Sequence, residues 1–411
     1  MDEVESEKTS NRKLSRTVKV LGLVSLFTDA SSEMIYPLLP IFLSSVLGAG
    51  VAFIGVIEGI AEGTASILKA FSGYISDRVG KRKALIFAGY GLSAITKPFF
   101  AAATAAWQVL IVRFVDRVGK GIRTAPRDAM IADTTGEDIR GKAFGFHRAM
   151  DTLGAVIGPG LAFLLMWLLR GQGNARYRWV FLAAFVPGII ALVLIVFVLR
   201  EKSSTAEAKF PGLRLSGFSR NFKMLLVVVV VFMLGNSSDA FLLLRAQKLG
   251  VKVVMIPLVW MVFNIVYSIV STPGGMLSDR IGRKKTLLAG FFLYALIYLG
   301  FAFVHRLVFV WLLMAAYGVF YGLTQGVLSA YVADLSPPKM KGTAFGVFQT
   351  ADGVSRLLAS IIFGVMWQLI GPGAAFLFGA GMAAVAGFLM WTFCEECARE
   401  ETPAANRRAT G

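Results

Sequence analysis

Several carboxylates lie inside long apolar runs of this chain, where an ionised acid must pair with a cation or take up a proton. Asp29 and Glu33 are four residues apart in the first run, so both project from one face of a helix. A buried structural hydrogen-bond network would also account for that pair. A carboxylate that exchanges a proton inside a membrane can couple a proton gradient to transport. We predict proton-coupling sites at Glu62 first, then Asp29, Glu58, Glu33 and Asp239.

Basic residues that can partner these acids follow in a charged run from Arg113 to Asp128. Arg113, Arg117 and Lys120 recur every three or four positions, which places them on one helical face. Arg113 can pair with Glu58 or Glu62, and the carboxylate is then the titrating member because a guanidinium keeps its proton. The same face suits an anionic ligand if it lines a cavity, unless the run lies outside the membrane. We predict a substrate cavity lined by Arg113, Arg117, Lys120, Asn236 and Gln325.

The composition is that of a membrane protein. The chain has 411 residues, of which 56% are hydrophobic and 16% charged, and a soluble fold of this size could not hide so much apolar surface. An apolar run of about 18 residues can cross a bilayer as a helix. We predict about twelve such runs, at 17–47, 52–75, 84–104, 106–133, 142–170, 178–200, 223–248, 252–277, 286–304, 307–333, 341–370 and 373–394.

The net charge of +17 comes mainly from the tails, the middle linker and two loops, as the positive-inside rule requires, and no nucleic-acid partner is expected. Both termini should therefore be cytoplasmic in a multi-pass protein of the cell (inner) membrane. Arg170, Arg176 and Arg178 lie on the outer side, against the rule. Cys394 and Cys397 fall two ligands short of a structural zinc site, so no metal or cofactor is expected.

A repeat divides the chain in two. G-Y-I-S-D-R-V-G-K-R-K at Gly73–Lys83 returns about 200 residues later as G-M-L-S-D-R-I-G-R-K-K at Gly275–Lys285, and Asp133 has a counterpart in Asp334. A period of half the chain predicts two homologous halves. The expected fold is an all-α membrane protein with twelve transmembrane helices in two pseudo-symmetric six-helix bundles. The predicted parts are a tail at 1–16, a bundle at 17–200, a linker at 201–222, a bundle at 223–394 and a tail at 395–411.

The doubled loop resembles the hallmark loop of the major facilitator superfamily. That resemblance implies that the loop aspartates latch one conformation by contacting a helix start in the other half. Asp77 would lie beside the helix that begins near Lys341, and Asp279 beside the helix that begins near Lys142. The implied gating residues are Gly73, Asp77, Arg78, Gly80, Gly275, Asp279, Arg280 and Gly282.

Two further motifs extend the resemblance. Gly154, Gly158 and Pro159 look like the fifth-helix motif of drug:proton antiporters, and Arg113 looks like the intramembrane arginine of the fourth-helix motif. The run D-R-V-G-K-G-I-R-T-A-P-R-D-A resembles a little-characterised prokaryotic branch of the superfamily. The antiporter-type motif implies a kinked, closely packed fifth helix.

The predicted function is secondary active transport, as proton-coupled efflux of small amphipathic organic compounds by alternating access. The alternative is proton-coupled uptake of a small organic anion. An intramembrane enzyme would need a nucleophile with its base or a set of metal ligands, and two histidines far apart in sequence supply neither. A non-transporting sensor is a further alternative. The expected partners are a small-molecule substrate, protons and the lipid bilayer, with the protein acting as a monomer.

Overall fold

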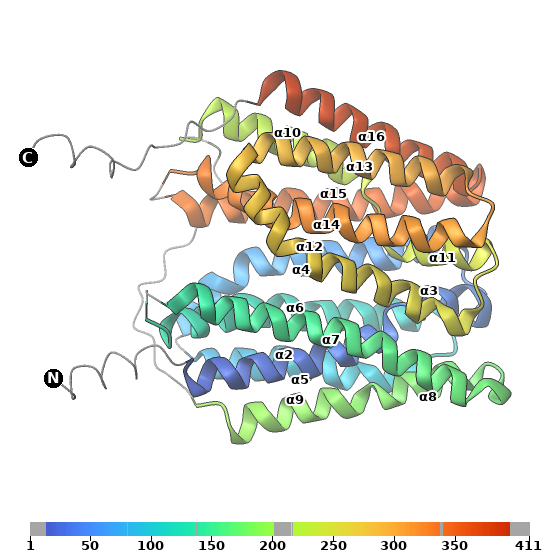
Figure 1. The fold of residues 1–411 in the computed structure, drawn as a ribbon. Coiled ribbons are helices and arrows are strands. Elements are labelled where there is room, and N and C mark those ends of the chain that lie inside the picture. Colours follow the sequence, from blue (N-terminus) through green and yellow to red (C-terminus); the bar gives the residue numbers. More distant parts are fainter. Residues whose placement is uncertain are drawn as a thin grey trace, which may run out of the picture.

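Long helices run back and forth between two ends of an elongated bundle (Figure 1). The computed structural model describes residues 14–79, 81–136, 139–200, 215, 217–337 and 340–394, without the side chains of 73–75 and 77–79. Every regular element in this described part is helical, as predicted. The elements are α2 Arg16–Ile35, α3 Leu39–Ile41, the π-helix η1 Phe42–Val46, α4 Val51–Val79, α5 Arg82–Ala102, α6 Ala106–Asp133, α7 Arg140–Leu168, η3 Arg170–Gln172, α8 Ala175–Ala183, α9 Phe185–Phe197, α10 Arg220–Gly235, α11 Ala240–Lys248, η4 Val253–Met255, α12 Ile256–Ile281, α13 Arg283–Phe303, α14 Leu307–Asp334, α15 Lys341–Leu369 and α16 Pro372–Phe393.

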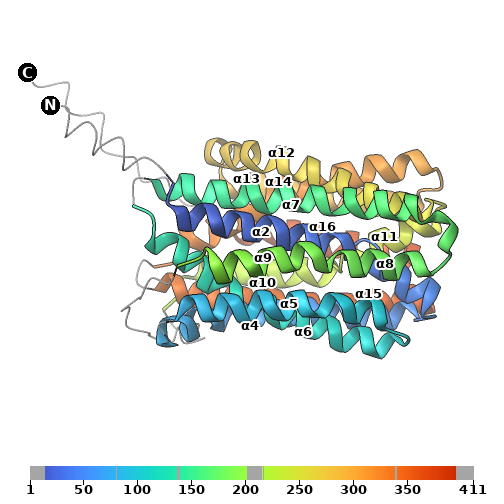
Figure 2. The same ribbon diagram turned by 90° about the horizontal axis from the view of Figure 1, so that it is seen from below.

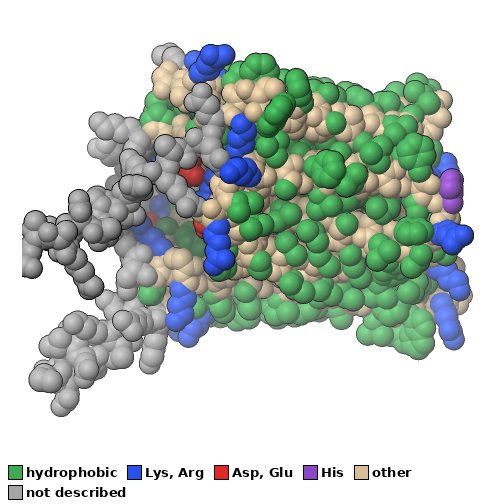
Figure 3. Space-filling model, turned by 45° about the horizontal axis from the view of Figure 1, so that its top comes forward, with side chains coloured by type: hydrophobic (Ala, Val, Ile, Leu, Met, Phe, Trp, Pro, Cys, Tyr) green, Lys and Arg blue, Asp and Glu red, His purple; other side chains and the backbone are tan. Residues whose placement is uncertain are grey.

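These helices form twelve spans, and nine of the described spans are long and apolar enough to cross a membrane by length and composition. The other three are the α2–α3–η1 span, α6 and α15. In the view of Figure 3, apolar side chains cover the middle of the surface, and Lys and Arg gather toward its two ends. The fold predicted from the apolar runs is therefore confirmed.

The first span of each half is broken at an equivalent place. Helix α2 ends at Ile35, before Pro37, because proline cannot donate the next helical hydrogen bond. Helix α10 ends at Gly235, and α11 begins only at Ala240. Non-helical backbone at membrane depth is tolerated where it lines a cavity. The second break therefore brings short polar side chains to the bundle centre.

The two halves share contacts as well as topology. Arg82 at the start of α5 pairs with Asp133 at the end of α6, and Arg283 on α13 donates to Asp334 on α14 at 3.2 Å. Lys83 Nζ donates to the Val196 carbonyl at 3.1 Å, and Lys284 Nζ donates to the Trp391 carbonyl at 2.9 Å. Each pair recurs after about 200 residues, so the repeated loop is held in the same way in both halves.

The halves meet where α4 packs beside α15 and α7 beside α12 (Figure 2). Small residues permit the α4–α15 contact. A Cβ atom at Gly55 would lie 2.3 Å from the Ser360 carbonyl oxygen, and one at Gly59 would lie 2.7 Å from that of Leu357. Backbone therefore packs directly against backbone across the interface between the halves.

At the end opposite the repeated loops the bundle is closed. Buried apolar side chains from both halves, among them Leu38, Phe42 and Leu243, belong to one continuous core. The amide of Ala52 donates to Gln368 Oε1 at 3.0 Å, and Gln247 Nε2 donates to Ser45 Oγ at 3.1 Å, so polar contacts also tie the halves together there.

Candidate functional site

A polar cavity lies between the halves at the centre of the bundle. Its inner part has a volume of about 190 Å³, and a wider part of about 570 Å³ adjoins it. The wider part reaches Arg127 and Asp128 near the end of α6 and Arg148 near the start of α7, so it extends toward the end that carries the repeated loops. Acidic side chains are visible in a hollow at that end (Figure 3). Nine residues line both parts: Asp29, Glu33, Glu62, Lys120, Arg123, Asp239, Trp260, Tyr321 and Arg356.

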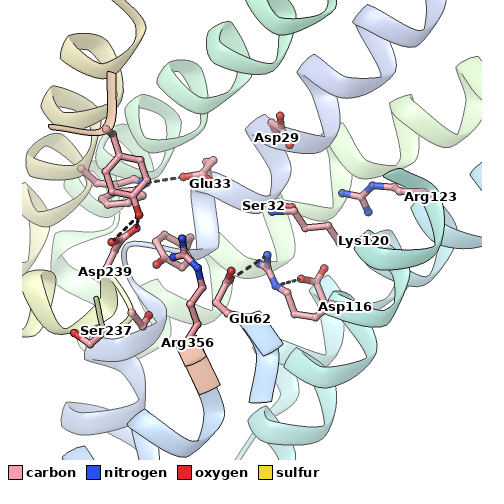
Figure 4. Close-up of a pocket in the computed structure, with 15 residues that line it drawn as sticks. Asp29, Ser32, Glu33, Glu62, Asp116, Lys120, Arg123, Ser237, Asp239 and Arg356 are labelled. Atoms are coloured by element: carbon pink, nitrogen blue, oxygen red, sulfur yellow. Dashed lines mark hydrogen bonds and ion pairs between the residues drawn. The ribbon is translucent and has the colours of Figure 1, made fainter. Parts of the chain in front are cut away.

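One face of α6 forms a cationic wall of this cavity (Figure 4). Arg117 Nη1 lies 3.7 Å from Glu62 Oε1, and Arg117 Nε lies 3.4 Å from Asp116 Oδ2. Arg123 Nη1 donates to Ser93 Oγ at 2.5 Å, and its guanidinium carbon lies 4.4 Å from the centre of the Tyr90 ring. Arg117 is therefore neutralised locally by two acids, whereas Arg123 is held by neutral groups.

Glu58 and Arg113 form a buried ion pair behind the cavity wall. Arg113 Nη2 lies 3.0 Å from Glu58 Oε2, and the two side chains are 4% and 1% exposed. Ser238, in the break between α10 and α11, donates to the same carboxylate oxygen at 3.3 Å. The pair thus links α4 and α6 of one half to the broken span of the other. Glu58 pairs with Arg113, while Glu62 pairs with Arg117 and faces the cavity.

Helix α2 contributes two acids to the cavity. Glu33 Oε2 accepts a hydrogen bond of 2.5 Å from Trp260 Nε1 on α12, which is a contact between the halves. Glycines of α7 pack directly behind the turn that bears these acids: a Cβ at Gly154 would lie 2.4 Å from the Leu26 carbonyl oxygen, and one at Gly158 would lie 2.5 Å from that of Ala30. Pro159 lies inside α7, which continues to Leu168.

Aromatic rings form the opposite wall. Trp260 and Phe263 on α12 stack with ring centres 4.5 Å apart, and Phe263 meets Tyr321 of α14 edge to face at 5.2 Å. Asp239 Oδ1 accepts hydrogen bonds from Tyr317 at 2.5 Å and from Tyr321 at 3.4 Å. The one predicted acid of the second half is therefore held by phenol groups within an aromatic surface.

The predicted cavity residues separate into two groups. Arg117 and Lys120 line the inner part, and Gln325 lines the wider part. Arg113 and Asn236 are 3% and 1% exposed and lie outside the lining residues of both parts. Asn236 Oδ1 instead accepts a hydrogen bond of 3.4 Å from Tyr294. The arginine that the sequence analysis placed in the cavity thus belongs to the buried pair with Glu58.

Some residues of the site were not predicted from the sequence. Lys97 of α5 is 2% exposed, and its Nζ lies 3.1 Å from Asp116 Oδ1 and 3.3 Å from Ser32 Oγ. A lone lysine in an apolar run was the available signal, since an intramembrane cation needs a partner. No comparable signal marks Trp260 or Tyr321, because aromatic residues are ordinary members of membrane helices. Arg356 pairs with Asp352 at 2.9 Å and faces the same cavity.

The loop residues predicted to gate the protein are only partly described. Gly73, Asp77, Arg78 and Gly80 lie outside the residues whose side chains the structure describes. In the second copy, Asp279 Oδ1 lies 2.6 Å from Arg283 Nη1, one turn further along the chain. Gly282 has φ of 100°, a conformation that favours glycine and turns the chain between α12 and α13. The latch itself stays a prediction.

Two related helical halves around a central polar cavity, with broken helices at its lining, are the architecture of secondary transporters that work by alternating access. The model of the family described as "Major Facilitator Superfamily" matches residues 21–263 and 224–410, and the chain belongs to this family. It is 37% identical to an uncharacterised MFS-type transporter of Methanocaldococcus jannaschii, over 94% of this chain and 97% of the relative.

More distant relatives extend the comparison. The tetracycline resistance protein, class E, of Escherichia coli is 24% identical over 92% of this chain and 96% of its own. The crystal structure of a D-xylose–proton symporter has the same fold, with a TM-score of 0.75 at 18% identity, covering 93% of this chain and 98% of that chain. These similarities establish a transporter fold.

Proposed function

We propose that this protein is a proton-coupled secondary transporter that exports small amphipathic organic compounds by alternating access. The observation that carries the proposal is the cavity between the halves, which combines a charged wall on α6 with an aromatic wall on α12 and α14. A compound with a polar group and an apolar ring matches both walls. The similarity to a tetracycline resistance protein favours export.

Glu62 is the proposed coupling residue. Its side chain is 32% exposed, it lines both parts of the cavity, and it pairs with Arg117 at 3.7 Å. Arg117 also contacts Asp116, so it keeps an acidic partner when Glu62 takes up a proton. Protonation of Glu62 would therefore break one weak ion pair without leaving a buried cation unpaired. Asp29, Glu33 and Asp239 also reach the cavity and are the next candidates, whereas Glu58 is committed to Arg113.

The test is transport in liposomes with pyranine trapped inside to report pH, using tetracycline, ethidium and 1-naphthoate as probes. We expect at least one probe to move protons through the wild-type protein. Glu62→Gln should abolish this proton movement while exchange of the same probe without a pH gradient persists, because binding and rocking need no titration. A Glu62→Gln protein that still accumulated the probe with proton energy would place the coupling elsewhere. Absence of proton movement with every probe in the wild type would contradict proton coupling.

A second candidate, proton-coupled uptake of a small organic anion, is favoured by Lys120 and Arg123, which line the cavity without a carboxylate partner among the described residues. Sealed vesicles that accumulate 1-naphthoate while protons flow inward would support uptake. Accumulation of 1-naphthoate while protons flow outward would support export.

A further inference from the structure

We propose that the substrate is an organic anion whose acidic group binds between Lys120 and Arg123 while its aromatic or apolar body lies against Trp260, Phe263 and Tyr321. This inference names the substrate class of the proposed transport site. It rests on the proposed transport function but does not depend on whether the protein exports its substrate or takes it up.

The cations of the cavity are not equivalent. Arg117 has Glu62 and Asp116 within ion-pair distance, Arg356 has Asp352, and Arg127 has Asp128 at 2.9 Å. In the part of the chain that the structure describes, Lys120 has no ion pair or hydrogen bond from its ammonium group, although its side chain is exposed to the cavity. Its ammonium group is therefore available to pair with the acidic group of a ligand in the cavity.

Arg123 is placed to complete the same subsite. It lies three residues after Lys120 on α6, so both side chains reach the cavity from one face (Figure 4). Arg123 is 6% exposed. In its described hydrogen bonds, Nη1 donates to Ser93 Oγ and to the Gly89 carbonyl. A guanidinium has five N–H donors in a planar fork, so donors remain for a carboxylate or phosphate. The Tyr90 ring and Ser93 fix its orientation before any ligand binds.

Two acids of the cavity are held by neutral hydrogen-bond donors and not by cations. Glu33 accepts from Trp260, and Asp239 accepts from two tyrosines, so neither depends on a cation. Asp29 shares the wall with Lys120 and Arg123 but forms no ion pair with them among the described residues. The cationic charge available to a ligand is therefore concentrated on α6. The aromatic rings across the cavity present flat apolar surfaces, which suit a ring-bearing body.

Binding by isothermal titration to the full-length protein in lipid nanodiscs tests the proposal. The probes are 1-naphthoate, benzoate, the uncharged isostere 1-naphthamide and the cation 1-naphthylmethylamine. We expect 1-naphthoate to bind about tenfold or more tightly than 1-naphthamide, as one charge-assisted interaction provides. The amine should bind more weakly than the amide. Equal or tighter binding of the amide or the amine, or no binding of either carboxylate, would overturn the proposal.

Variants locate the subsite. Lys120→Gln and Arg123→Gln should each weaken 1-naphthoate binding by about tenfold and leave 1-naphthamide binding unchanged. Lys69→Gln is the matched control, because Lys69 lines the mouth of the wider part and carries the same charge. Its effect should stay below about threefold, since a charge near the solvated mouth is screened. Phe263→Leu should weaken carboxylate and amide alike. Equal losses of affinity in all three charge variants would show that the general electrostatic potential of the cavity attracts the anion, and this would overturn the assignment.

The outcomes separate this inference from the transport proposal. If 1-naphthoate binds as described but moves no protons in liposomes, the substrate class stands and proton coupling fails. If another probe moves protons while the carboxylates do not bind, proton coupling stands and the substrate class fails.

Discussion

At the scale of single residues, the two acids of α4 have different environments although they are one helical turn apart. Glu58 is sealed between α4, α6 and the break before α11, where it meets Arg113 and Ser238. Glu62 faces the cavity and meets Arg117 over a longer distance. A buried ion pair that loses one partner leaves an uncompensated charge. When a partly exposed acid is removed, water can solvate the cation that it leaves behind. Substitution of the two glutamates should therefore have different effects on the free energy of unfolding.

We predict that Glu58→Gln lowers the free energy of unfolding by about 3 kcal/mol, because the buried Arg113 loses its acid at 3.0 Å and, among the described residues, keeps only Asp116, at 4.0 Å. Thermal unfolding of the purified protein in detergent should show a lower midpoint. Glu62→Gln is the matched control and should shift the midpoint much less, since its side chain is 32% exposed. Equal shifts in the two variants would mean that Glu58 has no special structural role.

At the scale of elements, the contact between α4 and α15 holds the halves together. It depends on glycines, because a Cβ at Gly55 would lie only 2.3 Å from the Ser360 carbonyl oxygen. This contact belongs to a conformation that is closed at the end opposite the repeated loops. Forcing the two helices apart there should therefore weaken this conformation relative to the one open at the other end.

We predict that Gly55→Ala shifts the conformational equilibrium, since overpacking of this kind costs about 1–3 kcal/mol. Spin labels at Ala49, before α4, and Ile370, after α15, should report a longer mean distance in the variant. Gly387→Ala on α16 is the control, because a Cβ at Gly387 meets no atom within 4 Å. An unchanged distance distribution in Gly55→Ala would show that the close contact does not set this equilibrium.

At the scale of the whole molecule, the basic loops predict the orientation in the membrane. Both copies of the repeated loop lie at the same end of the bundle, where α2 begins and α16 ends (Figure 1). The wider part of the cavity extends toward that end. If this end is cytoplasmic, as the positive-inside rule predicts, the structure is in an inward-open conformation.

We predict that a cysteine at Ala49 is labelled by a membrane-impermeant maleimide added outside intact cells, and that one at Gly141 is labelled only after permeabilisation. Cys394 and Cys397 are first replaced by serine. Gly141 lies at the start of α7, beside the repeated loops, and a Cβ there meets no atom within 4 Å. The reverse labelling pattern would contradict cytoplasmic termini.

Much of the architecture was determined by the sequence alone. Apolar runs long enough to span a bilayer predict the helices, and the recurrence of the loop at Gly275–Lys285 predicts the two halves. The prediction that Arg113 pairs with Glu58 or Glu62 is confirmed by the ion pair between Arg113 and Glu58. These features are local or periodic, and therefore a single chain displays them.

Only the tertiary structure decided which charges face the cavity. Arg113 and Arg117 are four residues apart on one helical face, yet one is buried against Glu58 and the other lines the cavity. The aromatic wall and the pairing of Lys97 with Asp116 likewise depend on how distant helices rotate and pack. Sequence periodicity places a side chain on a face of its helix. Which neighbour covers that face is set by the packing of segments far apart in the chain.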